Sequence, residues 1–246
     1  MKKCICKKLP ITLNNFLYDI IKQENRFNNT ALAGKLINLW KPNKDLKVSF
    51  QLYDSSPKLI DEILEIANTW SKYCSMNFVY EKQNEFADIL VSLRKNRGFY
   101  SAIGLHSKVF ASKNKPSMNL DPKSGIEPDF SRKKEPNSKY CKYLILHEFG
   151  HALGLIHEHQ REDRPFHFNK HYIKRYFKIL GMPSYDVAKE NILQTYENQN
   201  IIKSRFDYKS IMIYPFERFV IKENFSIKIP YELSEIDKIK ISKIYP

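Results

Sequence analysis

Apolar and polar side chains alternate along residues 48–53, and this period of two predicts a strand. Turn and cap residues at 54–57 separate it from apolar residues at helical spacing over 59–70, which predict an amphipathic helix. Two further short apolar runs, at 76–80 and 88–93, predict strands. The order strand, helix, strand is typical of a crossover unit in a sheet with parallel pairing.

Outside this unit the pattern is less regular. Helices are predicted, from the spacing of apolar positions, at 140–153, 171–180, 185–196 and 233–244, the last beginning with Ser234 and Glu235. Residues 113–138 are rich in Lys, Pro, Ser and Asn and predict a loop, with one short strand at 117–120. Residues 1–29 predict a short helical lead segment and a polar linker.

The composition favours a folded chain with a large core. Of the 246 residues 42% are hydrophobic and 13% aromatic, which argues against disorder and allows one large domain or a compact two-lobed one. No run approaches the ~18 to 20 apolar residues of a membrane-spanning helix. The formal charge is +14, but the 41 basic residues are mostly lysine and are dispersed, which indicates a solvated surface more than a nucleic-acid footprint.

The cysteines and the first residues say little about cellular location. Four cysteines without a C-x-x-C pair predict neither a cysteine zinc site nor a disulfide scaffold, so the redox compartment stays open. The chain begins Met-Lys-Lys, but residues 4–15 include two lysines, a proline and two asparagines instead of an apolar core. We therefore expect no conventional secretory signal here.

Three histidines and a glutamate follow one another at a characteristic spacing. His147 and His151 are four residues apart, so on a helix they lie on one face and can bind one ion. Glu148 comes directly after the first histidine, where its carboxylate can reach water instead of the metal. Gly154 is expected to end the helix, because glycine tolerates the left-handed backbone, and the returning chain then presents His157 as a third ligand.

This donor set predicts catalysis. Three neutral nitrogen ligands leave one coordination position of zinc open, which is typical of catalytic sites. We expect one catalytic Zn²⁺ ion on His147, His151 and His157, which lowers the pKa of its water towards ~7 and polarises the scissile carbonyl. Glu148 then accepts the proton of the attacking water and passes it to the leaving amine. The prediction is a zinc metalloendopeptidase, a hydrolase of peptide bonds.

Other interpretations of the same residues stay open. In one interpretation the histidines are incidental. In another the chain is an inactive basic zinc domain that binds an anionic partner. Retention of Glu148 and the lack of a nucleic-acid motif argue against this second interpretation. A hydrolase of non-peptide amides is a third. His159 could replace His157 as a ligand through an unusual turn, and a Cys4 or Cys6 thiolate could block the zinc.

The spacing of the site, with a methionine turn after it, resembles the metzincin peptidases and the astacin-like members in particular. Glu158 directly follows the third histidine, and Ser-Ile-Met-Ile-Tyr at 210–214 is similar to the Ser-x-Met-His-Tyr turn of that family. Further family-like segments occur in order at 39–40, 87–89, 101–104, 157–161, 206–209 and 233–237. Cys74 has no evident partner for the disulfides of animal members, so bacterial-type members resemble the chain better.

The resemblance implies an α/β fold with a mixed sheet, in a two-lobed metzincin catalytic domain with zinc in the interlobe cleft. It further implies that Met212 lies beneath the zinc as a structural floor, and that Tyr214 ligates zinc at rest and then swings to stabilise the oxyanion. Ile213 departs from the family histidine, which is not a ligand there, so the departure weakens the subfamily match more than the mechanism.

The resemblance also suggests how substrate and termini are handled. A peptide or protein substrate would lie extended along an upper edge strand, for which 117–120 is the expected segment, and the enzyme would be a monomer without a nucleic-acid partner. Glu158 would hold a new N-terminus if cleavage fell near Ala31. Residues 1–30 would then be a pro-segment before a domain at 31–246, and the family favours secretion.

Overall fold

The computed structural model describes residues 38–51, 57–95, 97–121, 139–169, 171–173, 192–195 and 204–246. The expectations for the lead segment and for Cys4 and Cys6 lie outside these residues, as do residues 122–138 of the loop predicted at 113–138 and most of the helices predicted at 171–180 and 185–196. None of the described helices has both the length and the apolar character needed to cross a membrane.

A five-stranded mixed sheet forms the first half of the fold. In chain order its strands are β1 Asp45–Gln51, β2 Asn77–Tyr80, β3 Ile89–Ser92, β4 Tyr100–Ser101 and β5 Met118–Asn119. The spatial order is β2-β1-β3-β5-β4, with parallel pairing except between β4 and β5. The predicted crossover unit and the mixed sheet are both confirmed.

The expected edge strand was placed wrongly. The segment at 117–120 contains β5, which pairs with β3 on one side and with β4 on the other. Among the described strands, β4 is therefore the edge beyond β5. Its two residues are too few to show alternation, so no sequence pattern announced it.

The α-helices within the described residues are α2 Pro57–Ala67, α3 His106–Ala111, α4 Lys139–Ala152 and α7 Glu235–Ile244. Short 3₁₀ segments follow or link them: η2 Trp70–Lys72, η3 Asn84–Phe86, η4 Glu158–Gln160 and η7 Arg218–Val220. The predicted helices at 59–70, 140–153 and 233–244 correspond to α2, α4 and α7, whereas α3 had no prediction.

The two faces of the sheet are covered by different helices. Successive residues of a strand point to opposite faces, so Ile89 and Val91 join the main core whereas Leu90 packs with Ala87 and with Ala111 of α3. The main core also contains the buried residues of α2 and α4. The α3 helix therefore covers the face opposite to α2 and α4.

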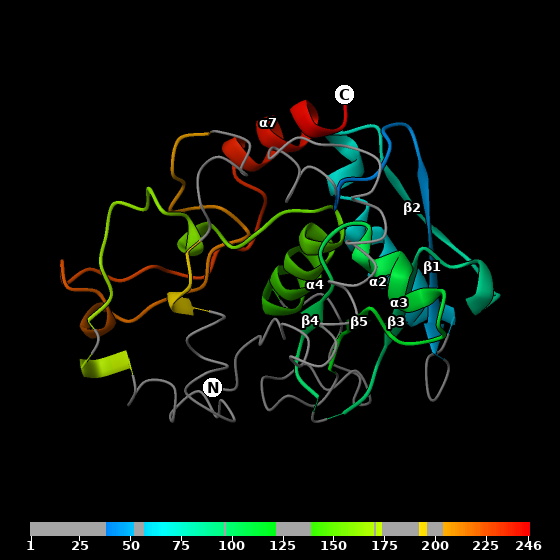
Figure 1. Ribbon diagram of the computed structural model, residues 1–246, viewed down its shortest axis with the longest axis horizontal. Helices are drawn as coiled ribbons and strands as arrows, with labels where there is room; N and C mark the ends of the chain where they lie inside the picture. The colour runs from blue at the N-terminus through cyan, green and yellow to red at the C-terminus, as the bar shows by residue number, and fades with distance from the viewer. Residues whose placement is uncertain are drawn as a thin grey trace, which may run out of the picture.

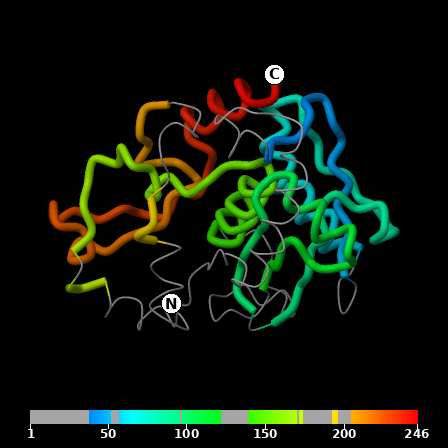
Figure 2. The backbone as a smooth tube through the Cα atoms, in the orientation of Figure 1, coloured from blue at the N-terminus to red at the C-terminus, as the bar shows by residue number. Residues whose placement is uncertain are grey.

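The α4 helix is buried on nearly all sides. Every residue from Tyr143 to Ala152 is buried, which a helix achieves only when structure surrounds it. In Figure 1, α4 lies between the sheet and the orange and red segments that follow residue 204. Residues 204–233 contain little regular structure beyond η7, and the tube in Figure 2 follows them into the red helix α7. This placement brings the end of α4 against the C-terminal part of the chain.

Candidate metal centre

The end of α4 orients one of the predicted ligands. Gly154 has φ +95°, as expected for a glycine that ends a helix. Its N–H donates to the carbonyl of His151 (2.8 Å), and the N–H of Leu155 donates to the carbonyl of Gly150 (3.0 Å), which together form a Schellman motif. The Leu155 carbonyl then lies 2.7 Å from Nδ1 of His151, so the turn that stops the helix also holds its last histidine.

The other two predicted ligands are held through the same ring atom. Nδ1 of His147 lies 2.8 Å from the carbonyl of Ile211, and Nδ1 of His157 lies 2.8 Å from Oε1 of Gln160. Because these acceptors are oxygens, each Nδ1 carries the hydrogen and each Nε2 presents its lone pair. Hydrogen bonds of this kind fix ring orientation and tautomer in histidine metal sites.

The three rings converge on one point. Their ligand atoms all lie within 4.8 Å of one another, and Nε2 of His151 is 3.1 Å from Nε2 of His157. Tetrahedral zinc with Zn–N bonds of ~2.0–2.1 Å separates its nitrogen ligands by roughly 3.3 Å, so this spacing fits the ion. All three side chains are buried, as is Glu148 at 0% exposure. The residues present therefore fit a zinc ion.

Tyr214 lies beside this cluster. Its ring centroid is 4.5 Å from that of His157 and 5.6 Å from that of His147. His159 is fully buried behind them, stacked on His157 at 4.8 Å with an interplanar angle of 24°, and its Nδ1 accepts the N–H of Tyr214 (3.4 Å). His159 thus contacts the cluster from outside and is not one of the three converging histidines.

Met212 lies against α4. A Cβ at Gly150 would lie 2.5 Å from Sδ of Met212 and 3.1 Å from the ring of Trp70. The helix therefore approaches the methionine turn closely because residue 150 has no side chain. The N–H of Glu158 donates to the carbonyl of Met212 (3.1 Å), which joins this turn to the loop of the third histidine.

A buried ionic network surrounds Glu158, which is 1% exposed. Its carboxylate contacts the Arg161 guanidinium at 2.9 Å and the Lys240 ammonium at 3.1 Å, and accepts the N–H of Asp207 (3.1 Å). Burial lowers the pKa of Arg161, but the hydrogen bonds to Asp163 and the charge of Glu158 outweigh it and raise that pKa above its ordinary value. Among the described residues, the Glu158 carboxylate therefore has two cationic partners, Arg161 and Lys240.

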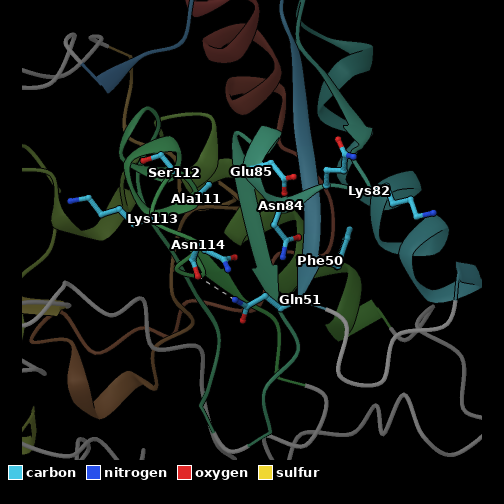
Figure 3. A pocket seen from close by; sticks show the side chains of 10 residues that line it. Phe50, Gln51, Lys82, Asn84, Glu85, Ala111, Ser112, Lys113 and Asn114 are labelled. Carbon is cyan, nitrogen blue, oxygen red and sulfur yellow. Dashed lines mark hydrogen bonds between the residues drawn. The ribbon is translucent and has the colours of Figure 1, made fainter.

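A separate pocket of about 840 Å³ lies elsewhere on the sheet. It is lined by residues of β1, of the η3 region and of the end of α3, whereas the histidines come from α4 and the loop after it. In Figure 3 the side chains of Lys82 and Lys113 extend away from its centre, and a hydrogen bond joins Nε2 of Gln51 to the carbonyl of Asn114. This pocket is not part of the metal centre.

Several groups that shape the centre had no signal in the sequence. The carbonyls of Leu155 and Ile211 are backbone atoms, and their role depends on where the chain turns. Gln160 follows His157 in the η4 segment, and its bond to that ring had no signal of its own. His159 was considered as an alternative ligand because it follows His157 by two residues, but its ring is stacked behind that of His157. Lys240 comes from a helix more than 80 residues further along the chain.

Two family models match the chain. The astacin peptidase model matches residues 137–239. The matrixin model matches residues 39–179, and this match alone covers more than half of the chain. The zinc metalloproteinase nas-6 of Caenorhabditis elegans is 31% identical over 113 residues, 42% of this chain and 30% of that protein. An astacin-like metalloendopeptidase of Coturnix japonica is 30% identical over 115 residues, 42% of this chain and 26% of that protein. The chain thus spans less than a third of the length of these relatives.

Solved structures agree with the family models. A structure of myroilysin superposes with a TM-score of 0.73 at 27% identity, covering 85% of this chain and 96% of that one. A hatching-enzyme zinc protease of Oryzias latipes superposes with a TM-score of 0.55 at 20% identity, covering 83% of this chain and 92% of that one. The second likeness shows the fold alone.

Proposed function

Because the chain belongs to the astacin-like metallopeptidases of the metzincin clan, we propose that it is a zinc-dependent endopeptidase. One observation carries the proposal: three buried imidazoles converge through Nε2 while each Nδ1 is hydrogen-bonded to an oxygen. This arrangement supports a single catalytic metal with an open coordination position. Peptides or proteins are the substrate class that the family implies.

In this proposal His147, His151 and His157 hold one Zn²⁺. Zinc supplies Lewis acidity there, which polarises a carbonyl and lowers the pKa of water. The hydrogen bonds to the three Nδ1 atoms keep the rings aligned and raise their basicity as ligands. The burial of all three rings excludes bulk water, which strengthens electrostatic interactions in the site.

Glu148 and Tyr214 are the proposed catalytic side chains. Glu148 accepts the proton of the attacking water and delivers it to the leaving amine, a role for which a buried carboxylate next to a ligand on α4 is suited. The Tyr214 hydroxyl stabilises the negative charge that develops on the carbonyl oxygen. Its ring contacts with His147 and His157 support this assignment.

The substrate is proposed to bind as an extended strand to a single copy of the chain. Backbone pairing would use the edge strand β4, Tyr100–Ser101, in place of the segment first expected. The +14 charge favours acidic side chains near the scissile bond. Nucleic acid is not a proposed partner, since the basic residues are dispersed and no binding motif accompanies them.

The test combines zinc content with cleavage of a peptide library. Wild-type protein should bind one zinc ion and lose cleavage when a chelator removes it. Glu148→Gln should retain zinc and lower kcat/KM by about 10²–10⁴-fold, whereas Glu65→Gln, on the exposed side of α2, should match wild type. Cleavage by Glu148→Gln at the wild-type rate, or cleavage that survives zinc removal, would contradict the proposal.

A further inference from the structure

The C-terminal helix α7 directs two charged side chains into the protein. Ser234 caps the helix by accepting the N–H of Asp237 (2.9 Å), and the Asp237 carboxylate accepts the N–H of Ser234 (3.1 Å) in return. Asp237 is 1% exposed, and the side chain of Lys240 is 11% exposed. Residues three apart on a helix lie on one face, so both point from α7 towards the same side.

Asp237 is connected to the first histidine through a single residue. Its two carboxylate oxygens accept the hydroxyl of Ser210 and the N–H of Ile211, both at 2.7 Å. The carbonyl of Ile211 is in turn the acceptor for Nδ1 of His147 at 2.8 Å. The position of that carbonyl, and with it the orientation of the imidazole, therefore depends on a carboxylate of α7.

Lys240 is connected to the third histidine through Glu158, the next residue after His157. Its ammonium lies 3.1 Å from Oε2 of Glu158, and the same carboxylate contacts Arg161 at 2.9 Å through Oε1. An uncompensated carboxylate in such a buried place is costly. Removal of Lys240 would therefore leave Oε2 without its cation and loosen the loop that carries His157.

We propose that α7 is a positioning element of the zinc centre, in which Asp237 orients His147 through Ile211 and Lys240 holds the His157 loop through Glu158. The inference rests on the proposed function, since it takes these histidines as zinc ligands. Groups that orient metal ligands typically alter metal affinity by 10–100-fold when removed. An element remote in sequence thus acts on two of the three ligands.

The first arm of the test compares two lysines of the same helix. In the full-length chain, Lys240→Met should raise the zinc dissociation constant about tenfold, measured by competition with a chelator. The matched control is Lys238→Met, whose ammonium pairs with the exposed Glu235 instead, and its zinc affinity should be that of wild type. Lys240→Arg keeps a cation at the site and should recover most of the affinity.

The second arm separates the orientation of His147 from the capping of the helix. Asp237→Asn removes the charge that holds Ile211, and should weaken zinc binding about tenfold. Ser234→Ala removes the cap hydroxyl but keeps Asp237, so it should lower thermal stability without a comparable loss of zinc affinity. This pair remains decisive if Lys240→Met does not fold.

The outcomes are distinguishable. Equal zinc affinities in Lys240→Met and Lys238→Met, together with equal affinities in Asp237→Asn and Ser234→Ala, would overturn the role of α7 while the proposed function stands. A wild-type chain that binds no zinc would overturn the proposed function, and this inference with it. Loss of zinc affinity in Asp237→Asn and Lys240→Met alone, with recovery in Lys240→Arg, would support the positioning role of α7.

Discussion

The sheet region and the segment 204–233 differ in what holds them together. In the first, backbone hydrogen bonds join five strands, and apolar residues of α2 and α4 pack on one face. In the second, the described residues contain only η7 and isolated antiparallel bridges at Phe216 and Ile221. Side chains such as Asp207 and Asp237 bond its backbone instead. The α4 helix belongs to the first region, but the carbonyl that lies against Nδ1 of its His147 is that of Ile211 in the second.

In place of a regular core, aromatic residues of 204–233 pack against Phe166 and Phe168, which precede that segment in the chain. Phe166 is 1% exposed, and its ring contacts those of Phe168, Phe206 and Phe225 at centroid distances of 5.4 to 5.9 Å. Edge-to-face contacts of this kind add to the burial of apolar area but require no repeating backbone. A site can thus be rigid where the chain has almost no secondary structure.

The largest expected effect tests whether the two regions unfold separately. Trp70→Ala removes a fully buried ring whose Nε1 donates to the carbonyl of Leu146 (3.0 Å), and should lower the free energy of unfolding by about 3–5 kcal/mol. Hydrogen exchange should then accelerate throughout the sheet region. Phe166→Ala should accelerate it mainly in 204–233. Equal acceleration everywhere in both variants would mean that the regions unfold as one unit.

The next largest expected effect is a loss of catalytic rate on changing Tyr214, the side chain that segment 204–233 places beside the three histidines. Tyr214→Phe keeps the ring contacts with His147 and His157 but removes the hydroxyl. We expect kcat to fall about a hundredfold with zinc affinity nearly unchanged, because a single oxyanion donor is lost. Steady-state kinetics measure this, with Tyr208→Phe, 43% exposed, as the control. Unchanged kcat would remove Tyr214 from the mechanism.

A smaller effect tests the contact between the regions. Gly150→Ala places a methyl group where Sδ of Met212 lies 2.5 Å away, so the methionine or the helix must move. Alanine favours a helix over glycine by up to ~1 kcal/mol, but overpacking costs about 1–3 kcal/mol. We expect a net loss of stability in denaturant unfolding. A more stable variant would show that the two regions are not closely packed at this point.

The smallest expected effect is a pH dependence of the unfolding free energy that arises from His106, in the sheet region. Burial lowers the pKa of His106, at the start of α3, below its ordinary value of 6.5. The unfolded chain then binds the proton more readily, so stability contributed by the neutral ring is present above pH ~6.5 and declines as the pH falls below it. His106→Gln should flatten the slope of unfolding free energy between about pH 7 and 5. An unchanged slope would exclude His106 as its source.

The periodic elements and the donor set were accessible to sequence reasoning. Alternation of residue types predicted β1, although the polar Ser49 is buried like its apolar neighbours Val48 and Phe50. Helical spacing predicted α2, because one face of this helix is buried and the other is not. The spacing of His147, His151 and His157 predicted the cluster that the fold brings together, since residues four apart on a helix share a face and Gly154 returns the chain. These signals are local, so they remain visible without the fold.

Tertiary structure alone decided the edge strand and the hydrogen-bond partners of the three histidines. The two residues of β4 have no readable period, and its place beyond β5 follows from pairing across the sheet. The carbonyl of Ile211 acquires its role only when Asp237 and His147 come together from distant segments. Ring orientation and charge compensation depend on distances in space, and a linear order of residues does not contain those distances.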